Sequence, residues 1–236
     1  MNLLEVNEIT SGYEGGQILW GVNLRLEKGK LTTLVGSNGV GKTTLLSTAM
    51  GLLRPWQGTI TFAGRDVTNL SAHARAKAGM VLVPEGRQLF TDMTVLENLE
   101  MGAFSRRARA TFNQNLEKVF ELFPRLQERA RQKAGTLSGG EQQMVAVGRG
   151  LMAEPEVLIL DELSLGLSPL LALTLFESLT RLKKTGLTML LVEQNVTMAL
   201  AVSDYAYVLA EGRVHLEGEA RALMKNDEVR RTYLGI

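Results

Sequence analysis

A glycine-rich segment near the start of the chain has the residue types and spacing of a phosphate-binding loop. It reads G36-S-N-G-V-G-K-T43, which fits G-x-x-x-x-G-K-[ST], and it lies between a strand-like run and a helix-like run. Glycines let the backbone wrap closely around phosphates, main-chain N–H groups and a helix start attract anions, and lysine adds positive charge. The alternative, a glycine-rich turn without a ligand, is disfavoured by the length and context of the motif. We therefore expect a phosphate site formed by Gly36, Ser37, Asn38, Gly39, Val40, Gly41, Lys42, Thr43 and Thr44, with the Thr43 hydroxyl reaching Mg²⁺.

A second pattern is the apolar run V157-L-I-L, which ends in Asp161 and Glu162. In a strand of the same sheet, Asp161 would lie at the phosphate end and hold Mg²⁺ through water, and Glu162 would polarise a water for attack on a γ-phosphate. An isolated Asp-Glu pair could simply end a strand. In a chain that also carries a phosphate loop, the pair indicates phosphoryl transfer to water, in which the protein positions groups and stabilises charge.

The stretch L190-L-V-E-Q-N195 is a third apolar run that ends in polar residues. Ligands of parallel sheets bind beyond the carboxyl ends of the strands, so Glu193, Gln194 and Asn195 could face a ligand. They could equally begin a solvated loop, with Asn195 as the N-cap of the following helix. The residues alone leave both interpretations open.

The elements that must position these motifs alternate between strand and helix, which predicts an α/β sheet. Residues 3–64 are rich in strands, and the apolar spacing of residues 109–123 predicts one amphipathic helix. A helix is expected from Pro169 to a stop at Gly186, and a hairpin is expected to turn at Glu211-Gly212. We therefore expect a single domain over residues 1–236, a nucleotide-binding core into which a helical block, about residues 95–138, is inserted.

Composition excludes several classes of protein. The 236 residues are 45% hydrophobic and 22% charged, which favours a globular chain, and the formal net charge of +1 gives no sign of nucleic acid as a partner. The chain has no Cys and only 2 His, so a thiol nucleophile and a zinc site are not expected. The first residues do not read as a secretory signal, and no apolar run approaches the ~20 residues that span a bilayer. We expect a cytoplasmic protein that contacts the membrane only through protein partners.

The segment L137-S-G-G-E-Q-Q143, some twenty residues upstream of L160-D-E, resembles the signature of ATP-binding cassette (ABC) proteins. The resemblance covers the whole chain and implies a P-loop ABC fold, with an antiparallel β subdomain and an inserted helical subdomain, that hydrolyses ATP with Mg²⁺. It also implies a head-to-tail dimer with a second ATP-binding subunit, identical or different. In that dimer Ser138, Gly139, Gly140 and Glu141 of one copy would close over ATP held by the other. Because family members have an aromatic residue at this place upstream of the phosphate loop, the resemblance also implies that Tyr13 stacks on adenine.

Other phrases are similar to the ATP-binding subunits of branched-chain amino-acid importers. They are V83-P-E-G-R-Q-L-F, A134-G-T-L-S-G-G-E-Q-Q-M, S164-L-G-L-S-P, L191-V-E-Q-N and the closing Y233-L-G. This resemblance implies transmembrane permease subunits as direct partners and a solute-binding protein as an indirect one. It implies a peripheral location at the cytoplasmic face of the inner membrane. Urea importers have a similar ATP-binding subunit and are the nearest alternative.

Some positions differ from the commonest ABC residues. Glu85 stands where most members have a Gln that touches Mg²⁺ and the attacking water, so it is expected to be a magnesium ligand and a catalytic group. Gln194 stands in place of the His that bonds the γ-phosphate; its amide can donate that bond without imidazolium charge. Ser168 replaces an Asp in the segment that crosses the dimer.

Leu163 replaces the Pro that usually follows the Asp-Glu pair. Loss of Pro removes a fixed φ and could loosen the turn that aims Glu162, slowing hydrolysis. Exchange of Leu163 for Pro is accordingly expected to raise turnover or leave it unchanged.

Two further functions stay open from the sequence. A soluble cassette ATPase of DNA repair or translation usually has two cassettes, a coiled-coil insertion or zinc-binding cysteines, and this chain has none of these. A regulatory module that scarcely hydrolyses ATP is suggested by Gln194 and Leu163.

Overall fold

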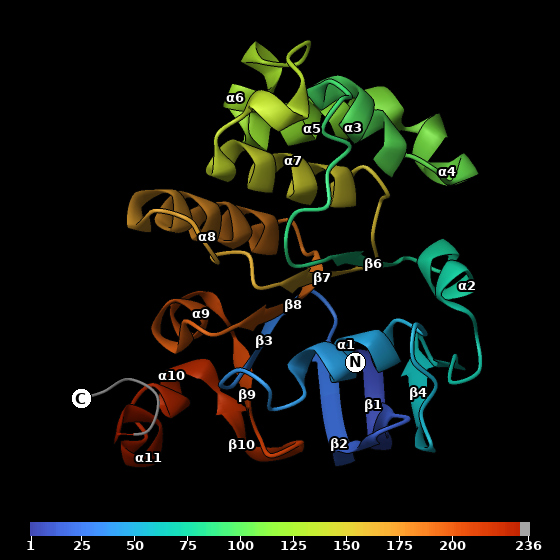
Figure 1. The fold of residues 1–236 in the computed structure, drawn as a ribbon, viewed down its shortest axis with the longest axis vertical. Helices are drawn as coiled ribbons and strands as arrows, with labels where there is room; N and C mark the ends of the chain where they lie inside the picture. Colours follow the sequence, from blue (N-terminus) through green and yellow to red (C-terminus); the bar gives the residue numbers. More distant parts are fainter. Residues whose placement is uncertain (232–236) are drawn as a thin grey trace.

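The computed structural model describes residues 1–231 of the chain. The Y233-L-G phrase lies outside the described residues. Within them, two sheets and the helices around them form a layered α/β architecture, with a helical block at one end (Figure 1).

The smaller sheet is antiparallel and comes from the first 66 residues. Its strands, in the order β2-β1-β4-β5, are β1 (Asn2–Tyr13), β2 (Gly16–Glu27), β4 (Gln57–Phe62) and β5 (Arg65–Asp66). Burial alternates along much of β2, where Val22, Leu24 and Leu26 are buried and their neighbours are not. This alternation is typical of a sheet with one face on the core and one in solvent.

The larger sheet has the strand order β10-β9-β3-β8-β7-β6. Its strands are β3 (Leu31–Val35), β6 (Met80–Val83), β7 (Val157–Asp161), β8 (Thr188–Glu193), β9 (Tyr205–Ala210) and β10 (Arg213–Glu219). All neighbours are parallel except β9 and β10, which form the predicted hairpin. Glu211 and Gly212 both have positive φ, 47° and 70°, as a two-residue hairpin turn requires.

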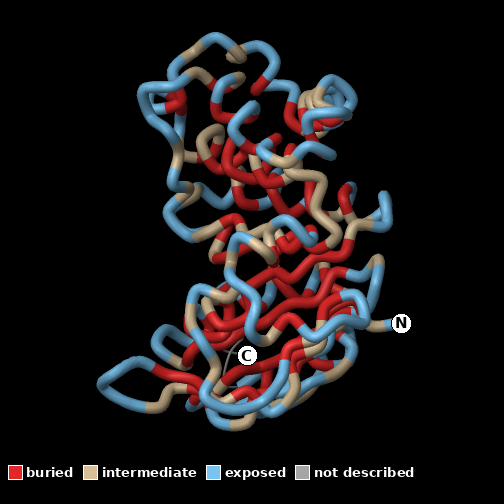
Figure 2. The backbone as a smooth tube through the Cα atoms, turned by 90° about the vertical axis from the view of Figure 1, so that its right-hand side faces the viewer, coloured by how far each residue is buried: buried red, intermediate tan, exposed pale blue. Residues whose placement is uncertain are grey.

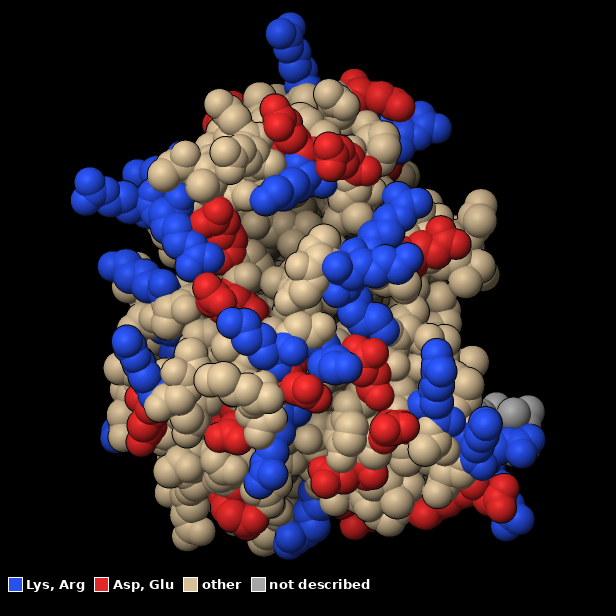
Figure 3. Space-filling view, turned by 180° about the vertical axis from the view of Figure 1, so that it is seen from behind, with Lys and Arg blue, Asp and Glu red and all other residues tan. Residues whose placement is uncertain are grey.

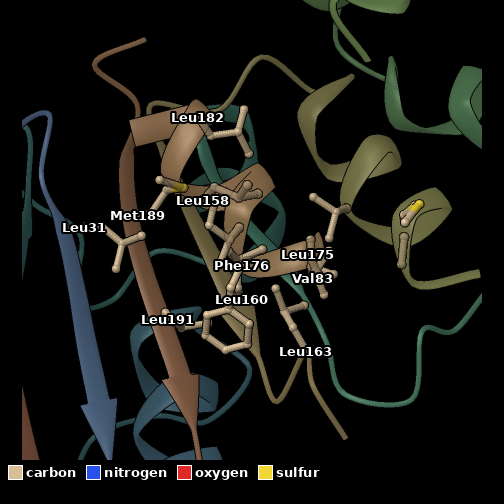
Figure 4. Close-up of a cluster of buried hydrophobic side chains, with 14 of the residues drawn as sticks. Leu31, Val83, Leu158, Leu160, Leu163, Leu175, Phe176, Leu182, Met189 and Leu191 are labelled. Carbon is tan, nitrogen blue, oxygen red and sulfur yellow. The ribbon is translucent and has the colours of Figure 1, made fainter. Parts of the chain in front are cut away.

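Every residue of β3, β7 and β8 is buried, because both faces of the sheet are covered. One face packs against α7 (Gly139–Leu151), α8 (Pro169–Lys184) and α9 (Val196–Val202), and the other against α1 (Lys42–Ala49) and the antiparallel sheet. Successive strand residues point to opposite faces. Leu158 and Leu160 therefore join the cluster under α8, whereas Val157 and Ile159 join the cluster under α1. Figure 2 shows that buried residues run through the interior of the molecule, and Figure 4 shows the cluster under α8.

Helix α8 follows the sequence prediction closely. It begins at Pro169, with the Ser168 hydroxyl accepting a hydrogen bond from Leu171 N, and its chain leaves the helix at Gly186 with φ 82°. The shorter helices of the core are α2 (Ala72–Lys77), α10 (Ala220–Leu223) and α11 (Asp227–Val229).

The helical block beside α7 contains the expected insertion. Its elements are α3 (Val95–Gly102), α4 (Arg106–Ala110), α5 (Phe112–Leu122), α6 (Pro124–Glu128) and the 3₁₀ turn η1 (Ala134–Thr136). The helix predicted over residues 109–123 is confirmed as α5, but it begins three residues later than expected, because the chain breaks at Thr111. The Thr111 hydroxyl contacts the Arg107 and Ala108 carbonyls and donates to Glu154 at 2.6 Å, so its side chain competes with helical hydrogen bonding.

None of the helices within residues 1–231 has the length and apolarity needed to cross a membrane. On the face shown in Figure 3, Lys and Arg side chains are interspersed with Asp and Glu side chains. That face therefore carries no uniform charge, in keeping with the net charge of +1.

Candidate functional site

The ends of four neighbouring strands meet at one edge of the larger sheet. In register, Val35 of β3 pairs with Glu193 of β8, Val192 of β8 pairs with Asp161 of β7, and Leu160 of β7 lies beside Val83 of β6. The segments that follow these strands are the phosphate loop, Gln194, Glu162 and Glu85. The structure therefore brings together the polar strand ends that the sequence singled out, at the edge where α/β sheets bind ligands.

The phosphate loop has backbone that glycine alone adopts easily. Gly41 has φ 108°, and a Cβ at Gly36 would lie 2.4 Å from the Leu209 carbonyl oxygen. The loop passes directly into α1, whose first residue is Lys42, so main-chain N–H groups and the positive end of the helix face the same space.

Lys42 is buried at this site, with 5% of its surface exposed. Its Nζ donates to the carbonyls of Gly36 at 2.8 Å and Ser37 at 3.1 Å, and lies 3.3 Å from Glu162 Oε1. A buried ammonium needs such partners, because an unpaired one would lose the solvation of its charge. Lys42 is thereby held with its charge next to the acidic end of β7.

A cavity of about 370 Å³ opens between these segments. The predicted site residues that line it are Asn38, Gly39, Gly41, Lys42, Thr43, Thr44, Glu85, Glu162 and Gln194. Ile18 of β2 and Leu165 also line it, and sequence reasoning missed both, since neither belongs to a polar motif.

Two carboxylates, Glu85 and Glu162, line the cavity, and Asp161 lies beside them at the end of β7. Burial, and then repulsion from Glu162 and Glu85, raise the pKa of Asp161 to about 6, while Lys42 opposes the rise. Asp161 is 6% exposed and lies at the end of β7, as expected. A carboxylate held among others in this way is suited to a nearby cation.

The candidate metal ligands suit a hard divalent cation such as Mg²⁺. Thr43, Glu85 and Asp161 offer oxygen donors only, which suits a hard cation. Within residues 1–231, no three His, Asp or Glu side chains come close enough to hold a metal ion by themselves. Such a sparse protein set is usual for Mg²⁺ that also binds nucleotide phosphates and water.

The residues of the β8 end have separate contacts. Gln194 Nε2 donates to Glu162 Oε2, and the Asn195 side chain accepts from Met198 N at 3.1 Å as the N-cap of α9. Glu193 does not face the cavity: it is buried and accepts hydrogen bonds from Ser164. Of the two open interpretations, the ligand-facing one therefore fits Gln194, the capping one fits Asn195, and neither fits Glu193.

The segment 138–141 lies at the start of α7, outside the cavity lining. Ser138 and Glu141 form a capping box, in which Ser138 N and Oγ donate to Glu141 Oε2 at 3.0 and 2.8 Å. Gly140 is buried under Leu171, so a side chain there would clash. Tyr13 ends β1, is 50% exposed and is also absent from the cavity lining. The structure of a single chain thus brings neither group to the phosphate loop.

The loop that carries Glu85 is held against α7. Arg149 Nη2 donates to the carbonyls of Arg87 at 3.2 Å and Gln88 at 2.8 Å, and its guanidinium lies 5.5 Å from the centroid of the Phe90 ring. Arg87 Nη1 donates to Gln142 at 3.0 Å. Burial lowers the pKa of Arg149, and its guanidinium binds main-chain carbonyls. Its partners come from a distant loop, which no local pattern indicates.

Comparison with known proteins gives full-length matches. The family model for ABC transporters matches residues 19–164. The chain is 43% identical to the high-affinity branched-chain amino acid transport ATP-binding protein BraG of Pseudomonas aeruginosa, covering 99% of this chain and 100% of that one. It is 37% identical to a probable branched-chain amino acid transport ATP-binding protein of Archaeoglobus fulgidus, covering 99% of each. Its fold is similar to the ADP conformation of an ATP-binding cassette from an ABC transporter, with 30% identity, TM-score 0.85 and 100% of both chains covered.

Proposed function

The chain belongs to the ABC transporter family, and from this premise we propose that it is the ATP-hydrolysing subunit of a membrane importer for branched-chain amino acids. The comparisons confirm three sequence predictions: the family, the P-loop ABC fold and the ATPase activity. The observation that carries the ATP-hydrolysing part of the proposal is the convergence of Lys42, Glu162 and Gln194 on one cavity at the carboxyl edge of the sheet, and the branched-chain amino acid part rests on the relatives.

In the proposed reaction the phosphate loop and Lys42 bind the β- and γ-phosphates of ATP. Thr43, Asp161 and Glu85 would hold Mg²⁺, which would supply positive charge beside the phosphate oxygens. Glu162 accepts a proton from the attacking water, and the Gln194 amide donates a hydrogen bond to the γ-phosphate. Both Lys42 and Gln194 contact Glu162, so these three side chains lie together at the position proposed for the γ-phosphate.

A second ATP-binding subunit completes the site in this proposal, by bringing residues 138–141 to the phosphate loop of the first. Exposed leucines support such an interface: Leu165, Leu170 and Leu173 are 51%, 73% and 53% exposed. Leu165 lies in the segment that joins β7 to α8, and Leu170 and Leu173 lie in the first turns of α8. An exposed apolar patch of this kind marks an interaction surface.

Permease subunits are the proposed membrane partners, and they hold the chain at the cytoplasmic face of the membrane. Large apolar side chains are exposed between the Glu85 loop and the end of α3, namely Phe90, Met93, Met101 and Phe104. A permease docked there would contact the loop that carries Glu85, and a solute-binding protein would act through the permeases.

The test of the catalytic role is Glu162→Gln. Loss of a general base typically lowers the rate ~10²- to 10⁴-fold, and the variant should still bind ATP and accumulate as an ATP-bound dimer. Glu177→Gln, on the exposed side of α8, is the matched control and should keep wild-type turnover. Wild-type turnover in Glu162→Gln would show that Glu162 is not the general base.

The test of the transport role is purification of the membrane complex with this chain as bait. Two permeases and a solute-binding protein that binds leucine, isoleucine or valine would support the proposal, and a urea-binding protein would favour the nearest alternative. A second candidate, a regulatory module with little hydrolysis, is favoured by the contact of Gln194 with Glu162. Release of phosphate that rises when the permeases are added would exclude it.

A further inference from the structure

The turn that follows β7 has an unusual backbone. Glu162 has φ 47°, a left-handed conformation that is uncommon for residues other than glycine. Its N–H donates to the Val192 carbonyl at 2.8 Å, and its carbonyl accepts from Leu165 N at 3.3 Å. Such a conformation persists only where the surroundings enforce it.

Glu193 supplies a second attachment between this turn and β8. Its Oε1 accepts from Ser164 N at 2.9 Å and its Oε2 accepts from Ser164 Oγ at 2.8 Å. The carboxylate is 2% exposed, and burial raises its pKa although the bonds from Ser164 act in the opposite direction. Burying a carboxylate is unfavourable unless its oxygens are hydrogen-bonded, and here one residue satisfies both of them.

The residue between these attachments is also fixed. Leu163 is fully buried and points into the cluster that contains Leu160, Leu175 and Phe176 (Figure 4). Glu162 is thus bonded to β8 through its main chain, Leu163 is packed, and Ser164 is bonded to Glu193. The next residue of β8, Gln194, contacts the Glu162 side chain itself.

We propose that Glu193 is a positioning residue for hydrolysis: its bidentate contact with Ser164 holds the turn that aims the Glu162 carboxylate into the cavity. This inference rests on the proposed role of Glu162 as the general base. Glu193 touches neither the cavity nor, by inference, the substrate, so its effect is on the orientation of Glu162 rather than on the binding of ATP. The same contact ties the end of β8 to the segment that leads into α8.

The experiment compares Glu193→Ala, Glu193→Gln, Ser164→Ala and the double variant Glu193→Ala/Ser164→Ala. Because a misplacement of about 1 Å can lower a rate ~10²-fold, Glu193→Ala should lower kcat roughly 10- to 100-fold while KM for ATP stays within about 3-fold. The double variant should be no slower than Glu193→Ala, because both changes break the same contact. Glu193→Gln should recover most of kcat, since an amide oxygen can accept from Ser164 N and its N–H₂ can donate to the hydroxyl.

The matched control is Ser178→Ala, which removes a buried hydroxyl of α8 that donates to the Thr174 carbonyl at 2.9 Å. It should lower thermal stability as Ser164→Ala does and leave kcat unchanged. The proposal is overturned if Glu193→Ala keeps wild-type kcat, if the single effects multiply in the double variant, or if Glu193→Gln is as slow as Glu193→Ala. Glu162→Gln, measured alongside, separates the two proposals: if it keeps full turnover, the role of Glu162 fails; if it is slow and Glu193→Ala is not, only the positioning role fails.

Discussion

Replacement of Leu163 by Ala tests whether packing holds the catalytic turn. The side chain is fully buried, so the change removes its apolar contacts and leaves a cavity under α8. A buried Leu→Ala change costs about 3 kcal/mol, and for a chain of this size each kcal/mol lowers Tm by about 2–4 °C. We therefore expect Tm to fall by about 6–12 °C, and kcat at a temperature where the chain is folded to fall roughly 10-fold, because the turn loses one of its attachments.

The assay measures thermal unfolding by circular dichroism, and phosphate release at 15 °C below each Tm. Leu126→Ala is the control, since Leu126 is equally buried but lies in α6 of the helical block. It should lower Tm by a similar amount and leave kcat unchanged. If both variants lose the same activity, the turn has no special dependence on Leu163, and our reasoning is refuted.

Leu163→Pro tests backbone stiffness against packing. The sequence predicts that proline raises turnover or leaves it unchanged. In the structure the turn is already fixed by Glu193, by Val192 and by packing, and among the described residues Leu163 N donates no hydrogen bond that proline would remove. Proline does remove most of the buried side chain, so we expect turnover to fall by up to about 10-fold, as in Leu163→Ala. A rise above the wild-type rate would show that the turn is loose and that stiffness outweighs packing.

Three further outcomes follow from the structure. Gln194→Ala should lower kcat ~10-fold in a phosphate-release assay, because it removes the amide donor of the site. Gln194→His should retain more activity than Gln194→Ala. Full activity in Gln194→Ala would mean that the residue only ends a strand. Arg75→Met should lower the free energy of unfolding in urea by at least about 3 kcal/mol, because the fully buried guanidinium donates to the carbonyls of Thr48 and Ala49 at the end of α1. The control Arg54→Met, at an exposed position, should change it by less than about 0.5 kcal/mol. Burial raises the pKa of Tyr207 to about 12, so the contribution of this pKa shift to stability is complete below pH ~10 and is lost as the pH rises towards 12. Between pH 9 and 11, the free energy of unfolding of Tyr207→Phe should therefore fall by about 1 kcal/mol less than that of wild type.

The phosphate loop and the polar strand ends could be predicted because each is a local pattern. Each of these patterns can be recognised within about ten residues, whether it is a glycine-rich loop before a helix or an apolar run that ends in acids. The parallel sheet then follows from the alternation of strands and helices, and it brings Lys42, Glu162 and Gln194 together.

The contacts that sequence reasoning missed join distant segments. The sequence predicts that Glu193 faces a ligand or begins a loop, but its partner is Ser164, in the turn that follows β7. Arg149 binds a loop some sixty residues earlier. At the break, Thr111 donates to Glu154, which lies 43 residues further along the chain. Periodicity contains no information on such pairs, since only the folded chain brings them together.

The sheet order also affects when the site can form during folding. β3 pairs with β8 through register contacts such as Leu31 with Met189, and Thr33 Oγ1 donates to the Leu191 carbonyl at 2.8 Å, a contact that spans 158 residues of chain. Non-local pairing of this kind is slow, because a long loop must close before any contact forms. The phosphate loop is therefore synthesised early but gains its neighbours late, and we expect nucleotide to bind only to chains that extend past residue 194. During refolding, nucleotide affinity should appear with the last kinetic phase rather than with the first helical signal.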